Sequence, residues 1–384
     1  MLQTTTKIYF DNAATTPLCD EARQAMEPYW SDVFGNASSP YAISRAARGA
    51  VDAARHQIAN LIGAYPDEIV FTSGGTESDN WALLGTALAQ DKNSERHVIL
   101  SNIEHPAILE TAETLRQIDV DVDFAACDEN GVVHPDEIEK LLRESTFLVS
   151  LMMVNNETGV MQPVNEIARL LKDTKVLLHT DAVQAAGKVL LDVDELGVDL
   201  LSLSGHKIRG PKGSGALYVR RNTHMQSLLR GGPQERGRRA GTENIPAIVG
   251  FGVAAESAKS TFDRNQMHLL NLRTALEREL SAIDGIVIHG KNAQRAPHIC
   301  NFSLPGKRAE SVVLNLDLQG FAVGTGSACA SGALHPSHVL EAMHVPLEEA
   351  QNSLRVSFGV QNTIEEVDKF VSVIKKITTS STSS

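Results

Sequence analysis

The sequence contains little cysteine and no surplus of basic residues. Only four of its 384 residues are cysteines, and these lie far apart with no C-x-x-C pair. This spacing does not suit a zinc or redox motif and predicts reduced thiols in a cytoplasmic protein, with no bound metal. Lysine and arginine number 35 against 47 aspartates and glutamates, a formal net charge of −12. We therefore expect no direct nucleic-acid partner and no attraction to an anionic membrane surface.

Long hydrophobic runs are also missing. The longest apolar stretches, such as residues 147–154, are far too short to span a bilayer. Residues 1–7 show no basic region followed by an apolar block, so we expect no secretory signal. Hydrophobic residues make up 42% and charged residues 21%, as in an average globular protein with a large core. The length indicates two or three domains at roughly 150 residues per domain.

Short apolar strands alternate with amphipathic helices through the first two thirds of the chain. Strands are predicted at residues 68–71, 97–100, 147–154, 176–179 and 198–202, and helices at 21–29, 43–62, 80–89, 107–118 and 164–171. Strands that are apolar along their whole length are buried on both faces. The pattern therefore indicates an α/β fold with a parallel sheet between helices.

The pattern changes after about residue 255. The predicted elements there are helices at 263–283, 309–319 and 364–377 and strands at 286–288 and 321–323. We predict a large domain over residues 15–258 and a smaller α+β domain formed by residues 1–14 and 259–377. Residues 378–384 are only threonine and serine, with nothing to bury, so we expect a disordered tail there.

Two polar segments directly follow predicted strands, where ligands of open parallel sheets bind. Gly75 and Thr76 lie in a glycine turn before a helix. Such a turn is either an ordinary helix cap or a cradle for a phosphate. Asp181 follows the predicted strand at 176–179. It either caps the next helix or holds a protonated heteroaromatic nitrogen.

A third polar segment contains Ser204, His206 and Lys207 and precedes a glycine-rich turn at 210–215. A lysine between two strands is usually a solvated turn residue, but this one has neighbours that can hydrogen-bond a phosphate. A lysine that forms a Schiff base needs partial desolvation and a nearby anion-binding pocket. A phosphate cradle, an acid for a pyridinium and a lysine for an aldehyde together predict a pyridoxal 5'-phosphate (PLP) site.

A series of short motifs runs along nearly the whole chain. They lie at residues 9–17, 34–36, 71–80, 104–106, 154–157, 204–207, 234–242, 326–329 and 355–359. In this order they resemble the motifs of cysteine desulfurases of the NifS/IscS type, in the class V aminotransferase family of PLP fold type I. The resemblance implies a mostly parallel seven-stranded sheet between helices, a smaller α+β domain, and a homodimer.

The same resemblance implies roles for individual residues. Lys207 would bond to the cofactor aldehyde, Asp181 would pair with the pyridine nitrogen, and His105 would stack on the ring. Asn156 and Arg355 would hold the substrate carboxylate, for which a planar guanidinium is a suitable two-pronged donor. The other cofactor contacts would come from Gly75, Thr76, Asn156, Gln184, Ser204, His206 and, in the partner subunit, Thr242.

Cys329 lies in a run of small residues at 324–332, before a predicted helix. A cysteine is most often a small core residue, but no bulky neighbour would form a core here. A thiol on a mobile loop near a helix N-terminus suits a nucleophile of lowered pKa. The resemblance implies that Cys329 takes the sulfur of L-cysteine as a persulfide and leaves L-alanine, with Lys207 and His105 also catalytic. The remaining cysteines, which we interpret as structural, are Cys19, Cys127 and Cys300.

Three features depart from the family pattern. Tyr41 stands where a histidine is common, Arg209 stands where an uncharged or aromatic residue is more usual, and the chain stops soon after Ile377. The short C-terminus leaves the sulfur acceptor open among an iron–sulfur scaffold protein, tRNA thiolation and DNA phosphorothioation. The alternative enzyme is a selenocysteine lyase or another class V PLP enzyme. The alternative of a different class is a sulfur-relay or assembly binding protein.

Overall fold

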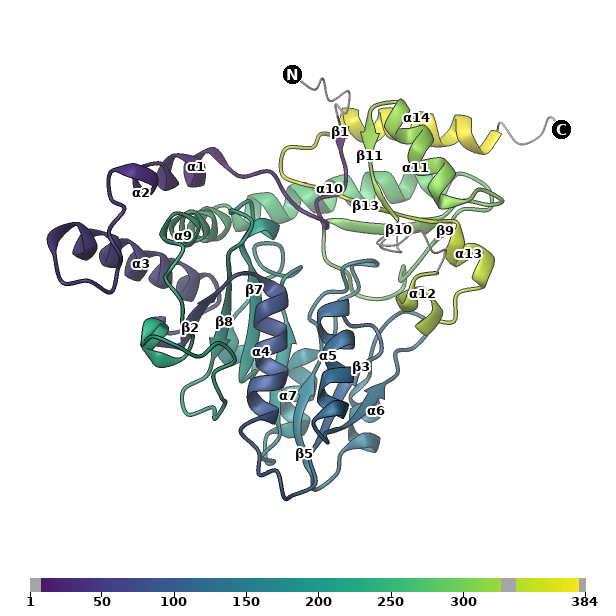
Figure 1. Cartoon of the computed structure of the whole chain (residues 1–384). Coiled ribbons are helices and arrows are strands. Elements are labelled where there is room, and N and C mark those ends of the chain that lie inside the picture. Colours follow the sequence, from purple (N-terminus) through teal and green to yellow (C-terminus); the bar gives the residue numbers. More distant parts are fainter. Residues whose placement is uncertain (1–7, 326–335, 380–384) are drawn as a thin grey trace.

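The computed structural model describes residues 8–325 and 336–379. Within these ranges a seven-stranded sheet lies between helices in one part of the molecule, and a four-stranded sheet lies in the other (Figure 1). No helix in the described ranges is both long and apolar enough to cross a membrane. The α/β architecture predicted from the alternating strands and helices is confirmed.

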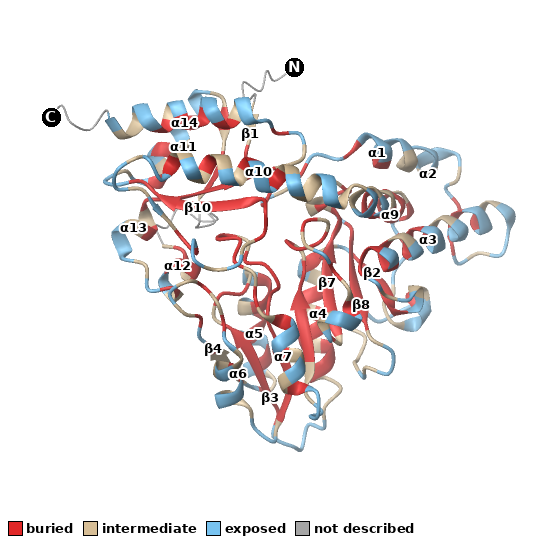
Figure 2. Ribbon diagram, turned by 180° about the vertical axis from the view of Figure 1, so that it is seen from behind, coloured by how far each residue is buried: buried red, intermediate tan, exposed pale blue. Residues whose placement is uncertain are grey.

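The seven-stranded sheet has the order β2-β8-β7-β6-β5-β3-β4. Among these strands only β8 runs antiparallel to its neighbours, so the sheet is mostly parallel. Its strands are β2 (Ile69–Thr72), β3 (His97–Ser101), β4 (Asp121–Ala125), β5 (Thr146–Ser150), β6 (Leu177–Asp181), β7 (Leu200–Ser204) and β8 (Gly215–Val219). Every residue of β2, β3, β5, β7 and β8 is buried, as expected for strands covered on both faces (Figure 2).

Alternate side chains of each strand face opposite helical layers. Val98 of β3 packs in one cluster with Trp81 of α4 and Ile108 of α5. The next residue, Ile99, lies in the cluster that contains Ile167 of α7. The helices of this part are α1 (Asp20–Met26), α2 (Pro28–Ser31), α3 (Ala42–Leu61), α4 (Gly75–Ala87), α5 (Pro106–Gln117), α6 (Pro135–Leu141), α7 (Val164–Leu171), α8 (Val193–Leu196) and α9 (Ile245–Ser260), with short 3-10 turns η1 (Pro66–Glu68), η2 (Gly205–Lys207) and η3 (Gln234–Gly237).

The smaller part joins the start of the chain to its C-terminal third. Strand β1 pairs in parallel with β11, and the four-stranded sheet has the order β12-β13-β10-β9. Phe10 packs edge-on against Phe358 and Phe370, with ring centroids 5.1 and 5.7 Å apart. The elements are β1 (Ile8–Tyr9), α10 (Phe262–Leu280), β9 (Val287–Ile288), β10 (Ile299–Ser303), α11 (Ala309–Leu318), β11 (Phe321–Ala322), β12 (Gly324–Thr325), α12 (His338–Ala342), α13 (Leu347–Gln351), β13 (Ser353–Ser357) and α14 (Ile364–Thr379). The predicted domain limits of 15–258 and of 1–14 with 259–377 stay a prediction.

Several predicted boundaries differ from the observed ones. The helix predicted at 21–29 is divided at Pro28, because proline has no N–H to continue the hydrogen-bond ladder. The strand predicted at 147–154 ends at Ser150, and the helix predicted at 80–89 already begins at Gly75. Helix α14 continues to Thr379, so the first two residues of the predicted tail are helical and that part of the prediction is wrong. The apolar face of α14 packs into the core of the smaller part, and this packing stabilises a helix that extends two residues beyond its last apolar residue, Ile377.

Candidate active site

The centre of the site is Lys207, at the end of the short turn η2 between β7 and β8. Its Nζ donates hydrogen bonds to the backbone carbonyls of Ala13 and Ala14, the latter at 2.8 Å. Burial lowers the pKa of the Lys207 amine to about 8, helped by the positive charge of Arg355 and opposed by Asp181. A considerable fraction of this amine is therefore neutral near pH 8, which is the form that attacks an aldehyde.

Asp181 lies at the carboxyl end of β6 and is buried. One carboxylate oxygen accepts a hydrogen bond from the Val183 N–H at 2.8 Å. Burial raises the pKa of Asp181, while the nearby His105 and Lys207 act in the opposite direction. Asp181, His105 and Lys207 therefore lie near one another in the fold, although they belong to separate segments of the sequence. Burial leaves the ionised carboxylate short of a positive partner, and a protonated ring nitrogen beside it would stabilise that charged form.

His105 caps the N-terminus of α5. Its Nδ1 accepts a hydrogen bond from the Ala107 N–H at 3.1 Å. Burial lowers the pKa of the imidazole, opposed by the charge of Asp181 and helped by the charges of Lys207 and His338. A neutral imidazole whose Nδ1 accepts carries its proton on Nε2, so His105 presents an N–H donor on its free side.

The predicted phosphate cradle forms at the N-terminus of α4. A Cβ placed on Gly75 would lie 2.8 Å from the Val183 side chain and 3.6 Å from that of Ser204, so only glycine fits this close approach. Helix α4 therefore begins directly beside the end of β7. Thr76 is exposed in its first turn, and His206 Nδ1 hydrogen-bonds the Thr15 hydroxyl at 3.0 Å. A helix N-terminus with free backbone N–H groups is an anion-binding site.

Two more predicted contacts converge on the same region. The Gln184 side-chain amide donates to the Ala13 carbonyl at 2.8 Å, the same oxygen that Lys207 contacts. Arg355, on β13, donates from Nη1 to the Asn156 carbonyl at 2.9 Å and from Nη2 to Asp11 at 2.7 Å. Its Nε is buried without a hydrogen-bond partner in the described structure. The guanidinium is thus fixed by two of its five N–H groups, and the second hydrogens of Nη1 and Nη2 are left to offer a carboxylate.

Two predicted residues are not part of this cluster. Thr242 is exposed in the segment before α9, and no hydrogen bond among the described residues joins it to the cradle. Cys329 lies outside the described residues. The other cysteines, Cys19, Cys127 and Cys300, are free and buried, and burial raises the pKa of each thiol. They are therefore protonated at neutral pH and poor nucleophiles. Residues 8–325 and 336–379 contain no group of three or more side chains suited to a metal ion.

Sequence reasoning missed the ion pair that fixes the start of α4. Glu77 accepts from both Nε and Nη2 of Arg239, at 2.8 and 3.0 Å, and from the Ser73 N–H at 2.8 Å. These hydrogen bonds lower the pKa of Glu77 although burial opposes them. The motif at 234–242 is visible in the sequence, but a pair separated by more than 160 residues leaves no mark in a single sequence.

A second buried ion pair from the same motif, between Glu235 and Arg55, holds strand β2. Both oxygens of Glu235 accept from Arg55 at 2.7 Å, and one also accepts from the Phe71 N–H at 2.9 Å. The Arg55 guanidinium lies over the Phe71 ring, 4.7 Å from its centroid. The motif at 234–242 thus anchors both β2 and α4, between which the phosphate cradle lies.

The start of helix α12 is hydrogen-bonded to Glu157 and Glu104, the chain neighbours of the predicted site residues Asn156 and His105. The Ser337 hydroxyl accepts from the Leu340 N–H at 3.1 Å as the N-cap and donates to the buried carboxyl of Glu157. His338 Nε2 lies 2.9 Å from the carbonyl oxygen of Glu104, the residue before His105. Burial raises the pKa of Glu157 to about 7. The segment that follows residues 326–335 is therefore tied directly to the candidate site, which the sequence did not reveal.

The residues present fit PLP. Lys207 supplies an amine, Asp181 supplies a buried acid, and the N-terminus of α4 at Gly75 supplies amides beside Ser204. These are the groups that an aldehyde, a pyridinium nitrogen and a phosphate require. His105 lies close enough to interact with both the amine and the acid. The donor set predicted from separate motifs is therefore assembled in one place.

Comparisons with known proteins show the family of the chain. Residues 8–370 match the aminotransferase class-V family. A curated relative from Dictyoglomus turgidum, Cysteine desulfurase IscS, is 44% identical and the match covers 97% of this chain and 94% of the relative. A solved NifS-like protein is 37% identical with a TM-score of 0.91, covering 97% of this chain and 99% of its own. Another structure, SspA in complex with cysteine, is 34% identical with a TM-score of 0.81, covering 93% of this chain and 100% of its own. The chain therefore belongs to the PLP-dependent aminotransferase class-V family, and within it to the NifS/IscS type, as the resemblance of its motifs predicts.

Proposed function

We propose that this chain, a PLP-dependent cysteine desulfurase, transfers the sulfur of L-cysteine to Cys329 as a persulfide and releases L-alanine. The convergence of Lys207, Asp181 and His105 beside the fixed guanidinium of Arg355 is the observation that carries the proposal. This arrangement suits an amino acid bound through its carboxylate next to an aldehyde cofactor.

The cofactor would be held by Lys207 at its aldehyde, Asp181 at its ring nitrogen and the Gly75 cradle at its phosphate. When bound, PLP supplies an electron sink that allows the Cα–H and Cβ–S bonds of an amino acid to break. Lys207 Nζ, with its pKa lowered to about 8, is suited to take a proton from the substrate and return it. His105 carries a proton on Nε2 that it can donate to a departing or entering group.

The substrate carboxylate would be bound by Arg355 and Asn156. Asp11 and the Asn156 carbonyl hold two arms of the Arg355 guanidinium, so the group is oriented before the substrate arrives. Preorganisation of this kind lowers the entropy cost of binding. Gly324 supports the role, since a Cβ there would lie 2.9 Å from Arg355 Nη2 and crowd it.

The sulfur step needs a thiolate, and Cys329 is the proposed nucleophile. Its thiolate attacks the Sγ of the substrate, the Cβ–S bond breaks, and the carbon fragment takes up a proton to become alanine. The three described cysteines are buried with raised thiol pKa values, which supports Cys329 by contrast. Ser337 and His338, which come shortly after Cys329 in the chain, are hydrogen-bonded to Glu157 and to the carbonyl of Glu104, next to His105.

We also propose a cytoplasmic homodimer in which Thr242 of one subunit contacts the phosphate site of the other. Trp30 and Phe34 are 63% and 70% exposed, and large apolar side chains with this exposure are typical of an interface. A sulfur-acceptor protein would then take the persulfide sulfur, for iron–sulfur cluster assembly or for thiolation. Selenocysteine lyase activity and a sulfur-relay binding role are the alternatives that the following experiment separates.

The test is release of alanine and sulfide from L-cysteine, with a reductant present, by the wild type and by Cys329→Ser. Equal amounts of alanine and sulfide from the wild type, with loss of both in the variant, would support a desulfurase with Cys329 as nucleophile. Activity that survives in Cys329→Ser would indicate a lyase that expels sulfide directly. PLP binding without activity on cysteine would favour selenocysteine as substrate, and failure to bind PLP would favour a binding protein.

A further inference from the structure

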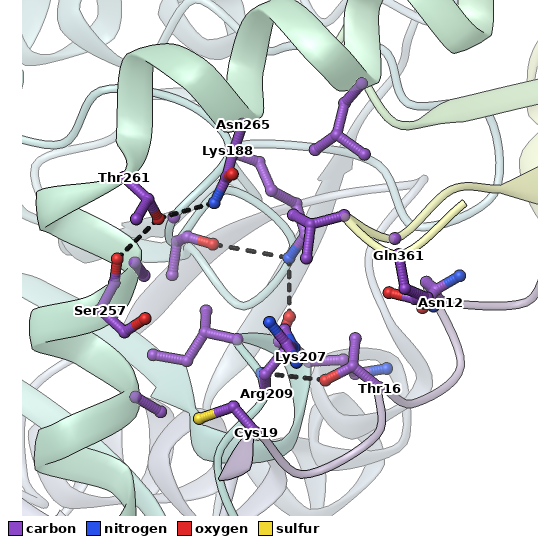
Figure 3. Close-up of a pocket in the computed structure, with 18 of the residues that line it drawn as sticks. Asn12, Thr16, Cys19, Lys188, Lys207, Arg209, Ser257, Thr261, Asn265 and Gln361 are labelled. Atoms are coloured by element: carbon purple, nitrogen blue, oxygen red, sulfur yellow. Dashed lines mark hydrogen bonds between the residues drawn. The ribbon is translucent and has the colours of Figure 1, made fainter. Parts of the chain in front are cut away.

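A cavity of about 430 Å³ lies beside the segment that carries Lys207, and its described lining does not include His105, Asp181 or Arg355. Its walls come from the N-terminal segment around Thr16, from η2 with the residues after it, and from the junction of α9 and α10 (Figure 3). Small-molecule sites have volumes in this range, roughly 300–1,000 Å³. The cavity is thus large enough for an organic ligand, and it shares Lys207 with the candidate active site but none of the side chains of His105, Asp181 and Arg355.

The charged side chains of this cavity are mostly basic. Lys188, Arg209 and Arg264 line it together with Lys207, and Glu21 is the single acidic residue among its described lining residues. Neither Arg209 nor Arg264 has a carboxylate within ion-pairing distance in the described part of the chain. In contrast, many other arginines of this acidic protein are paired. Unpaired guanidiniums facing a cavity create a local positive potential that attracts anions.

Arg209 is held in place with an unused donor. Its backbone is in the left-handed region, with φ of 67°, a conformation that is unfavourable for a side chain of this size. Two backbone hydrogen bonds fix it there, from its N–H to the Thr16 hydroxyl and from the Cys19 N–H to its carbonyl, both at 2.9 Å. The Nε of Arg209 is buried and has no hydrogen-bond partner among the described residues. Arg209 is therefore fixed in the wall of the cavity, with no carboxylate within ion-pairing distance in the described part of the chain to balance its charge.

Lys188 is a further basic residue of the cavity, and it contacts the backbone of η2. It is 7% exposed, and its Nζ donates to the Lys207 carbonyl at 2.9 Å, as Figure 3 shows. Burial, together with the charge of Lys207, lowers the pKa of Lys188 to about 7. Lys188 and Lys207 are two amines in close proximity, and their described surroundings in the cavity offer little negative charge. An anion in the cavity would supply it.

We propose that this cavity is a second ligand site, which binds a small organic polyanion carrying carboxylate or phosphate groups through Arg209 and Arg264. The proposal does not depend on the desulfurase reaction, since it rests on a different set of side chains. A ligand here would lie against the backbone that carries Lys207.

The experiment is calorimetric titration of the PLP-loaded enzyme, without cysteine, with citrate and separately with pyrophosphate. PLP fills the phosphate cradle, so the probes cannot bind there. We expect at least one probe to bind and Arg209→Gln and Arg264→Gln each to weaken it by about tenfold or more, the loss expected for a charge-assisted hydrogen bond. A preference for citrate or for pyrophosphate would distinguish a carboxylate ligand from a phosphate ligand.

Two matched variants control for charge and for place. Arg278→Gln removes the same charge from an exposed position on the same helix as Arg264, and we expect the probe affinity to stay within about twofold. Arg355→Gln should also leave it within about twofold, because Arg355 does not line the cavity. The proposal would be overturned if Arg355→Gln abolished binding while Arg209→Gln and Arg264→Gln did not. This result would place the anion in the substrate site. Absence of binding by both probes, or equal weakening by Arg278→Gln, would overturn it as well.

Discussion

The substitution Arg239→Gln tests how the phosphate cradle is built. Arg239 makes a two-pronged ion pair with Glu77 in the first turn of α4, and Glu77 also holds the Ser73 N–H. The side chains of Arg239 and Glu77 are only 21% and 14% exposed, so solvent screens the pair weakly. Without Arg239 the loop before α4 loses its connection to the motif at 234–242.

The magnitude follows from the number and type of bonds lost. Hydrogen bonds between charged groups contribute about 1.5–3 kcal/mol to stability. If this energy is what holds the cradle in its binding conformation, the dissociation constant of PLP should rise by roughly 10- to 150-fold. The double variant Glu77→Gln/Arg239→Gln should lose less than the sum of the two single variants, because the residues act as one pair.

The assay is titration of the apoenzyme with PLP, followed by its absorbance. Arg236→Gln is the matched control, because Arg236 is an exposed arginine in the same motif, and we expect its PLP affinity to stay within about twofold. An unchanged PLP affinity in Arg239→Gln would refute the reasoning. Strictly additive losses in the double variant would also refute it, since they would mean that Glu77 and Arg239 do not act as one pair.

Three further predictions concern the same site. Because only the neutral amine reacts and the pKa of Lys207 is lowered to about 8, the rate at which saturating PLP bonds to the apoenzyme should rise about tenfold from pH 7 to pH 9 and then level off; a rate still rising steeply through pH 10 would contradict this. Gly75→Ala should weaken PLP binding, since its Cβ would lie 2.8 Å from the Val183 side chain, and Val183→Ala should restore part of the affinity in a titration of the double variant. Ser337→Ala removes the N-cap of α12 and its hydrogen bond to Glu157, so we expect slower alanine release at unchanged PLP affinity. Equal rates of alanine release in the variant and the wild type would show that this hydrogen bond does not contribute to the reaction.

Much of the sheet and of the donor set could be predicted from the sequence. Strands such as β3 and β7 are short, apolar and bounded by polar turns, and the structure has them within two residues of the predicted limits. Lys207, Asp181 and Gly75 were identifiable because each follows a strand of a parallel sheet, and the ends of such strands meet at one edge.

The parts that the sequence did not predict depend on long-range contacts. Glu77 with Arg239 and Glu235 with Arg55 are separated by more than 160 residues, so no local spacing or periodicity marks them. Helix boundaries failed where one residue decides them, as at Pro28, or where tertiary packing extends a helix, as in the last turn of α14. The buried Glu104 carboxyl is likewise held by a long-range contact, since it accepts hydrogen bonds from the Ser101 hydroxyl and from the distant Met152 N–H, both at 2.7 Å.

The most direct test of the central claim is the location of sulfur after a single turnover. The PLP-loaded enzyme would be mixed with one equivalent of L-cysteine without reductant, and its peptides would be weighed by mass spectrometry while alanine is measured in parallel. We expect one extra sulfur atom on the peptide containing Cys329, in an amount equal to the alanine formed, and none on the peptides of Cys19, Cys127 and Cys300. Alanine formed with no extra sulfur on Cys329, or with the sulfur on another cysteine, would contradict the account.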